Sequence, residues 1–180
     1  MSTKVGSIKR YAYRLLHPRV AFLLLTKFGD RINVMTLAWH TPVDYDLIAI
    51  AVDRENYSYE LISKSKEFTL NVLPKLDVIW KAGTTSGRDV DKVGMLGLKL
   101  EEGVNISTPH VKDAIAYLEC KVENEIKMKE HSLLIAKIVH AWADERYFRE
   151  TWLEGVKVPM HVGKDIFTFP SKFKKIKESC

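Results

Sequence analysis

The chain has 180 residues, 46% hydrophobic and 28% charged, a composition that predicts one globular domain with a buried core. Its strongest apolar run, residues 20–25, is far shorter than the roughly 20 residues that a membrane helix needs. The opening residues include a lysine but no apolar stretch behind it, so we expect no signal peptide, no membrane partner and a cytoplasmic location.

The net charge of +5 raises the question of nucleic acid, but much of the excess lies in a basic C-terminal tail, residues 171–180. Elsewhere acids and bases alternate, so we expect no nucleic-acid partner; a basic barrel that binds single strands is a remote alternative. Cys120 and Cys180 have no spaced partners, and the six histidines lack the spacing of a helical metal site. We therefore expect no metal.

The first half of the chain predicts strands. Residues 19–28 and 32–39 are rich in β-branched and large apolar residues, and Gly29-Asp30 between them predicts a hairpin turn. Pro42 is expected to end the second strand. Residues 47–52 form a short, wholly apolar run, typical of a strand covered on both faces.

A change of period follows. Residues 57–66 place their apolar side chains on one helical face, with Asn56 or Ser58 as the N-cap. Residues 68–73 return to a strand pattern, and helical pieces are expected at 77–81 and 88–96.

The second half predicts a long antiparallel pair, residues 116–127 and 131–143, with a bend at Lys129-Glu130 and a last short strand at 166–169. No parallel βαβ rhythm and no G-x-G-x-x-G loop are present, which disfavours a Rossmann fold. We expect a mainly β, antiparallel barrel with helical decorations, in which residues 1–180 form a single domain.

Residues 83–92 are the first candidate site. Ser86 is expected to cap the next helix, and Gly87 leaves backbone N–H groups accessible to a phosphate. Arg88 offers a two-pronged donor, and Lys92, four residues later, is expected on the same helical face. The same spacing is compatible with a solvated turn that carries intrahelical ion pairs.

Residues 33–42 are the second candidate. Asn33, Thr36 and Trp39 alternate with apolar residues near a strand end, an arrangement that suits a flavin ring and equally an ordinary amphipathic strand with a core tryptophan. Arg54 and Ser58, after the next strand, form a weaker candidate for a phosphate site.

These segments, in this order, resemble the flavin reductase-like family of FMN-binding split β-barrels, and flavoredoxins most closely. The resemblance covers residues 17–170 and rests on five segments in register: residues 33–43, 56–72, 86–92, 130–135 and 161–163. Residues 86–92, Ser-Gly-Arg-Asp-Val-Asp-Lys, are similar to the family's Ser-Gly-Arg-Asp-x-Asp-Lys motif. The chain departs from the family at Ala82, where a cysteine is common, at Val93, and at Lys164, where a second glycine is frequent.

The resemblance implies an FMN-dependent oxidoreductase and a homodimer with FMN near the subunit interface. The implied electron donor is NAD(P)H or a small redox protein, and the implied acceptor is a small molecule or a redox partner. The implied phosphate contacts are Ser86, Gly87, Arg88 and Lys92, with Ser58, and Arg54 is added from the weaker candidate above. The implied ring contacts are Asn33, Thr36, Leu37, Ala38, Trp39, His131, His161 and Phe167. His131 is the candidate catalytic residue, because an imidazole can exchange a proton near neutral pH. The alternative is a reductase that supplies diffusible reduced flavin to a monooxygenase.

Overall fold

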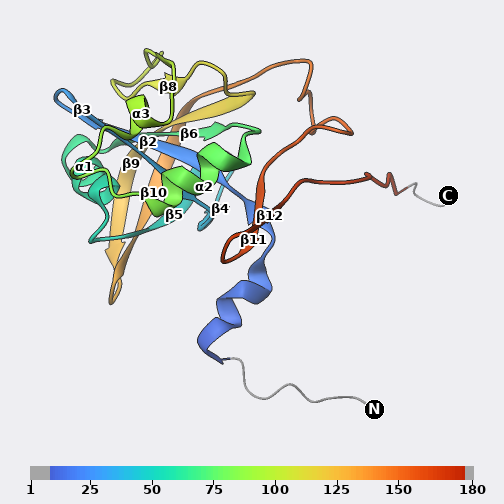
Figure 1. The fold of residues 1–180 in the computed structure, drawn as a ribbon, viewed down its shortest axis with the longest axis horizontal. Helices are drawn as coiled ribbons and strands as arrows, with labels where there is room; N and C mark the ends of the chain where they lie inside the picture. Colours follow the sequence, from blue (N-terminus) through green and yellow to red (C-terminus); the bar gives the residue numbers. More distant parts are fainter. Residues whose placement is uncertain (1–8, 177–180) are drawn as a thin grey trace.

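The computed structural model describes residues 9–176 and is built around one curled antiparallel sheet of seven strands (Figure 1). The strands follow the order β3-β2-β6-β9-β10-β5-β4 across the sheet. Their bounds are β2 (Phe22–Phe28), β3 (Arg31–Leu37), β4 (His40–Pro42), β5 (Leu47–Asp53), β6 (Glu67–Val72), β9 (Ala116–Lys127) and β10 (His131–Ala143).

Shorter elements surround this sheet. A small sheet has the order β1-β11-β12, from β1 (Arg19–Val20), β11 (Met160–Gly163) and β12 (Ile166–Thr168), and β7 (Leu100–Glu101) pairs with β8 (His110–Val111). The helices are the 3₁₀ helix η1 (Lys9–Leu16), α1 (Tyr57–Ser65), α2 (Leu76–Thr84) and α3 (Lys92–Met95). Figure 1 shows η1 projecting away from the body of the fold, below β11 and β12.

The core forms on both sides of β2, because three consecutive leucines in this strand are completely buried. Successive side chains of a strand point to opposite faces. Leu24 packs inside the curl of the sheet with Phe68 and Leu134, whereas Leu23 and Leu25 pack in a second cluster on the other face. The second cluster includes residues of α2, which fixes this helix against the sheet.

The predicted long hairpin is confirmed, since β9 and β10 have the expected bounds and a tight bend. The prediction of one strand over residues 19–28 was wrong. Ala21 donates its N–H to Pro159 O, so β1 pairs with β11 while β2 pairs with β3. Pro42 also does not end the preceding strand: β3 ends at Leu37, and Pro42 lies in the separate strand β4, which pairs with β5.

The strand expected to be covered on both faces, β5, is covered fully only on one. Ile48, Ile50 and Val52 point into the core, whereas on the other face Ala49 is buried but Leu47 and Ala51 are only half-buried. The outer face of β5 therefore leaves apolar surface accessible next to β4 and β10.

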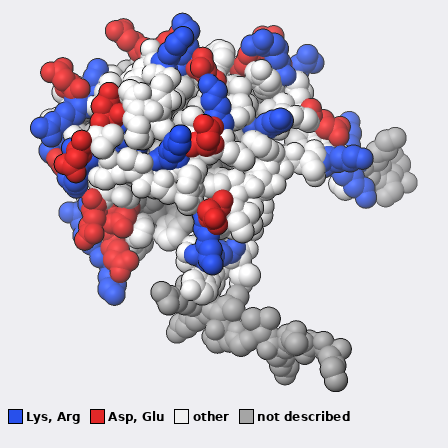
Figure 2. Space-filling model, viewed as in Figure 1, with Lys and Arg blue, Asp and Glu red and all other residues white. Residues whose placement is uncertain are grey.

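Charged side chains of both signs are mixed across the face of the molecule shown in Figure 2. This mixture agrees with the alternation of acids and bases in the sequence and gives no continuous basic groove on that face. Over residues 9–176, none of the helices has the length and apolar character needed to cross a bilayer.

Candidate functional site

A cavity of about 280 Å³ opens at the edge of the sheet where β3 and β5 end and β10 begins. Part of α2 and the turn between β11 and β12 complete its walls. The cavity brings together all but one of the residues predicted to contact a flavin ring: Thr36, Leu37, Ala38, Trp39, His131, His161 and Phe167. The structure thus places segments more than a hundred residues apart in one concave site.

The C-terminal turn of α2 forms a wall of this cavity because it packs closely on β3. The Thr36 hydroxyl donates a hydrogen bond to Ile79 O. A Cβ added to Gly83 would lie 3.2 Å from Thr36 Cβ, closer than most such contacts, so glycine allows the helix to approach the strand. The helix backbone at Gly83 and Thr84 therefore lines the cavity directly.

Aromatic rings surround the same cavity. Trp39 stacks on His131, with ring centroids 5.0 Å apart and planes inclined by 24°. On the other side, Phe167 contacts His161 at 5.0 Å and Trp80 at 6.3 Å. Flat apolar surfaces of this kind suit a planar ligand.

A second, more polar cavity of about 260 Å³ adjoins the first. Met35, Asn56, Gly83 and Thr84 line both, so the two form one continuous groove. The second cavity brings together Asn33 and most of the residues predicted to contact a phosphate: Ser58, Ser86, Gly87, Arg88 and Lys92. Asn33, predicted as a ring contact, therefore lies in the polar part of the groove.

The N-terminus of α1 faces this second cavity. Asn56 is the N-cap residue, but its side chain makes no capping hydrogen bond. Tyr57 and Ser58, the first two helical residues, line the cavity, and N–H groups at this position have no partner within a helix. Such groups, together with the helix dipole, favour an anion.

Lys92 is the buried cation of this cavity, with 3% of its surface exposed. Its ammonium donates hydrogen bonds to Ala82 O at 2.6 Å and to Thr85 O at 2.7 Å. An ammonium has three donors, so one more is available to a ligand. Burial lowers the pKa of Lys92 to about 8, because removal from water disfavours the charged form.

Gly87 gives this cavity its space. A Cβ at this position would collide with the Asn33 side-chain amide and lie 3.1 Å from Lys92 Cδ. The Asn33 amide is itself fixed, since it donates to the buried Ser58 hydroxyl at 2.9 Å. The loop can therefore pass close to β3 and α1 only with glycine at position 87.

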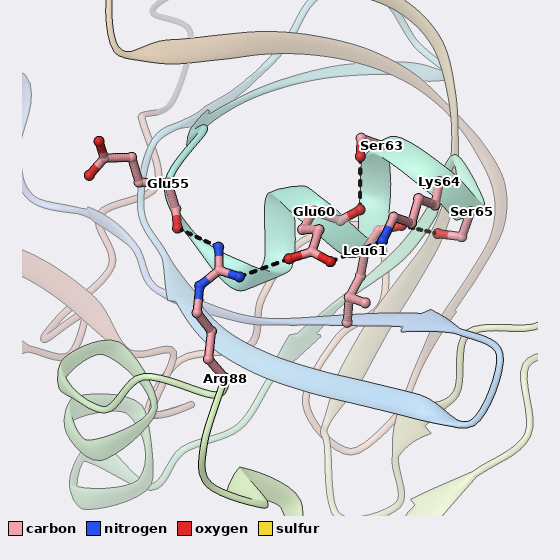
Figure 3. Close-up of polar contacts among 7 residues, drawn as sticks. All are labelled: Glu55, Glu60, Leu61, Ser63, Lys64, Ser65 and Arg88. Carbon is pink, nitrogen blue, oxygen red and sulfur yellow. Dashed lines mark hydrogen bonds and ion pairs between the residues drawn. The ribbon is translucent and has the colours of Figure 1, made fainter.

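Arg88 closes the loop against α1 (Figure 3). Its guanidinium forms an ion pair with Glu60 at 2.8 Å and donates to Glu55 O at 3.1 Å. Glu60 also accepts from Lys64, and these two hydrogen bonds, the one from Lys64 first, lower the pKa of Glu60. In Figure 3 the Arg88 guanidinium thus bonds Glu60 within α1 and Glu55, the residue before the N-cap of α1.

The predicted helix over 88–96 was wrong, and so was the role of Ser86 as its cap. The helix α3 begins only at Lys92, and Asp91 caps it by accepting from the Gly94 N–H at 3.1 Å. Ser86 instead accepts from the Arg88 N–H within the loop. Arg88 and Lys92 therefore do not share a helical face; they enter the site from a loop and from the first residue of α3.

Arg54, predicted as a phosphate contact, lines neither cavity. It donates to Lys129 O and Glu130 O, and so ties the start of α1 to the β9–β10 bend. Trp80 and Lys164 also line the first cavity, although neither was predicted as a site residue, and Thr84, within the candidate segment 83–92, lines it as well. The departure of Lys164 from the family pattern was the available signal for that residue.

Among residues 9–176, no group of three or more histidine, cysteine or acidic side chains is arranged to hold a metal ion. Cys120 is buried, and burial raises the pKa of its thiol to about 12. Cys180 lies outside the described residues. The two cavities are lined by aromatic side chains, by backbone groups and by the cations Arg88, Lys92 and Lys164.

Comparison with known families gives a match to the model described as flavin reductase like domain, over residues 14–159. An uncharacterized protein of Archaeoglobus fulgidus is 33% identical over 144 residues, which cover 78% of each chain. The NADH-dependent flavin reductase StyB of Pseudomonas fluorescens is 24% identical over 130 residues, 72% of this chain and 74% of StyB.

Solved structures share the fold over nearly the whole chain. Flavoredoxin of Desulfovibrio vulgaris (Miyazaki F) has a TM-score of 0.83 at 24% identity, covering 99% of this chain and 98% of its own. An FMN-binding protein from Thermus thermophilus has a TM-score of 0.82 at 20% identity, with 98% and 97% covered. The fold predicted from the sequence, an antiparallel split barrel with few helices, is confirmed.

Proposed function

Because the chain belongs to the flavin reductase-like domain family, we propose that it binds FMN in the joined cavities and works as an oxidoreductase. The observation that carries the proposal is the continuity of an aromatic cavity with an anion-attracting one. FMN has the same two parts, a planar apolar ring and a terminal phosphate. The FMN-binding neighbour of the same fold supports this choice.

The residues present fit the two ends of FMN. The start of α1, Lys92 and the loop around Ser86 would hold the phosphate, with Gly87 leaving the necessary space. Thr36 to Trp39 would lie along the ring, with Phe167 at its rim. When bound, FMN supplies the hydride or single-electron chemistry.

The protein's own part is to bind, orient and shield. Trp39 and Phe167 present apolar rings that would exclude water from the cavity. His131 is held against Trp39 by ring stacking and lines the cavity, so its imidazole is placed to exchange a proton there. The electron acceptor would be a small molecule or a redox partner.

The test is titration of the flavin-free protein with FMN, FAD and riboflavin. We expect tightest binding of FMN, because riboflavin lacks the phosphate and FAD extends beyond it. The visible spectrum of the protein as purified, and the identity of the chromophore released by denaturant, give an independent measurement. Equal affinity for riboflavin and FMN would refute the phosphate assignment.

A second candidate is a reductase that uses NAD(P)H to reduce exchangeable flavin for a monooxygenase. The relative named NADH-dependent flavin reductase favours it. Retention of FMN through gel filtration separates the two functions: a bound electron carrier retains FMN, whereas a diffusible-flavin reductase releases it and oxidises NAD(P)H only when flavin is added.

We further propose that two copies of the chain form a homodimer across the outer face of β5 and β10. Ala51 and Leu133 on this face are half-buried, and Val43, Tyr45 and Met128 nearby are exposed. This surface adjoins the ring cavity at Trp39 and Ala51, so a partner would lie beside the flavin.

Light scattering after gel filtration tests the dimer. Leu133→Lys should produce monomers, because a charge in an apolar interface is costly. It should also weaken FMN binding, since the lost partner would lie beside the flavin. Val104→Lys, at an exposed apolar residue that lines none of the cavities of the site, is the matched control and should stay dimeric. A monomeric wild-type protein would contradict the proposal.

A further inference from the structure

Basic residues from two distant parts of the chain lie beside one another next to the ring cavity, away from the phosphate end. They are Arg14 of η1, His17 after it, His161 of β11 and Lys164 in the turn between β11 and β12. His161 and Lys164 line the cavity itself. We call these four residues the basic mouth.

The members of the basic mouth are held together by contacts. His17 Nδ1 lies 3.0 Å from His161 O, and the two rings are 5.1 Å apart. His161 Nε2 lies 3.0 Å from Lys164 O, which orients the turn that carries the lysine. A Cβ at Gly163 would lie 3.6 Å from Arg14 Cδ, so the stem of this arginine passes directly beside the same turn.

The turn is built in an unusual conformation. Lys164 has a φ of 54°, in the left-handed region that favours glycine. The lysine therefore occupies a position where its backbone is disfavoured by about 1 kcal/mol or more.

The charges of the basic mouth have no ionic partner among residues 9–176. Neither Arg14 nor Lys164 forms a salt bridge in the described part of the chain. Arg14 lies instead over the rings of Tyr11 and Tyr13. Two acids are near: Asp165 follows Lys164, and Asp53 lines the far side of the cavity, where its carboxylate accepts from the Glu55 N–H.

We propose that the basic mouth is a second anion subsite, which selects an anionic, planar redox substrate for the flavin. The inference rests on the proposed function, since the substrate would lie against the bound ring. Cations without ionic partners beside a partly enclosed site concentrate anions, and the aromatic rim of Trp80 and Phe167 suits a flat molecule. The substrate class is therefore a conjugated molecule with a carboxylate, sulfonate or phosphate group.

The test measures binding to the FMN-loaded protein and needs no turnover. Benzenesulfonate is the probe, and benzenesulfonamide, of nearly the same shape but neutral at pH 7, is its control. Calorimetry and the perturbation of the flavin spectrum give both dissociation constants. The wild-type protein should bind the sulfonate more tightly, and 0.5 M salt should weaken the sulfonate alone.

Variants identify the residue. Lys164→Gln should weaken sulfonate binding by about fivefold, the upper range for an exposed charge pair, and leave the sulfonamide unchanged. Lys164→Arg should retain the preference. Lys99→Gln removes an exposed lysine that lines none of the site's cavities, and it should have no effect.

The outcomes are distinguishable. A protein that takes up no FMN shows this in its spectrum before any probe is added, and it overturns both the proposed function and the subsite that rests on it. An FMN complex that binds the two probes equally, or whose preference survives Lys164→Gln, overturns the anion subsite alone.

Discussion

Lys92 gives the sharpest prediction, because a phosphate bound in the second cavity would lie beside its charge. In the free protein its pKa is about 8, held there by burial. A bound phosphate would place negative charge beside the ammonium and raise this pKa again. FMN binding must therefore be accompanied by proton uptake above about pH 8.

The size of the effect follows from this pKa. Below pH 8, Lys92 is charged in both states, and FMN affinity should not depend on this group. Above pH 8, the free protein loses the proton, so affinity should fall by up to tenfold per pH unit, or about 1.4 kcal/mol. Between pH 7 and pH 9 we expect a loss of roughly tenfold. Riboflavin has no phosphate and should bind equally well across this range.

Isothermal titration at several pH values, in buffers of different ionisation enthalpy, measures both the affinity and the protons taken up. Lys92→Met should bind FMN more weakly at pH 7, by about 1–3 kcal/mol, and should lose the slope above pH 8. Titration of the flavin ring is common to riboflavin and FMN, so riboflavin controls for it. A wild-type FMN affinity that stays flat from pH 7 to pH 9.5 would refute the reasoning.

The same pKa has a consequence for stability in the absence of flavin. Between about pH 8 and pH 10.4, the unfolded chain holds the Lys92 proton and the folded chain does not. Stability rises with pH wherever the unfolded state binds more protons. The free energy of unfolding should therefore rise across that interval, as the buried ammonium becomes neutral. The difference between wild type and Lys92→Met in chemical denaturation isolates the contribution. Its full size is about 3 kcal/mol.

Two further predictions concern the ring and the loop. Trp39→Leu should remove a large part of the tryptophan quenching caused by FMN. Trp142→Leu should not, because Trp142 lies at the end of β10 opposite His131, the residue that Trp39 stacks on. Equal quenching in both variants contradicts the ring assignment. Gly87→Ala should weaken FMN binding and destabilise the protein by about 1–3 kcal/mol, because its Cβ collides with the Asn33 amide. The penalty should be smaller in an Asn33→Ala background, and strictly additive costs would rule out the collision.

The sequence predicted the long hairpin accurately because its information is local. Polar and apolar residues alternate over 117–122, residues 131–143 are rich in Leu, Ile and Val, and the bend at Lys129-Glu130 separates the two strands. Nothing in the neighbouring sequence indicated that the strand predicted over residues 19–28 divides at Ala21 into β1 and β2. The division depends on the N–H of Ala21 bonding Pro159 O, from a segment more than a hundred residues away.

The candidate site was predictable in membership but not in geometry. Within the motif over 86–92, Ser86 was predicted to cap the next helix, but Asp91, a residue type that caps helices equally well, caps it in the structure. Tertiary contacts determine where the helix begins, since Lys92 bonds carbonyls at the end of α2 and Arg88 bonds α1. The anion-attracting helix start is consequently that of α1 and not of the later helix.

The two basic residues of this motif therefore have different physical roles. Lys92 is buried and held by two carbonyls, so its charge is positioned before any ligand arrives. Arg88 is exposed and bonded to Glu60, and such a surface pair contributes only about 0–1 kcal/mol. A charge-assisted bond to phosphate is worth about 1.5–3 kcal/mol, enough to draw Arg88 from Glu60. Preorganisation of the site thus depends on Lys92 and the start of α1, and Arg88 provides a contact that can be exchanged.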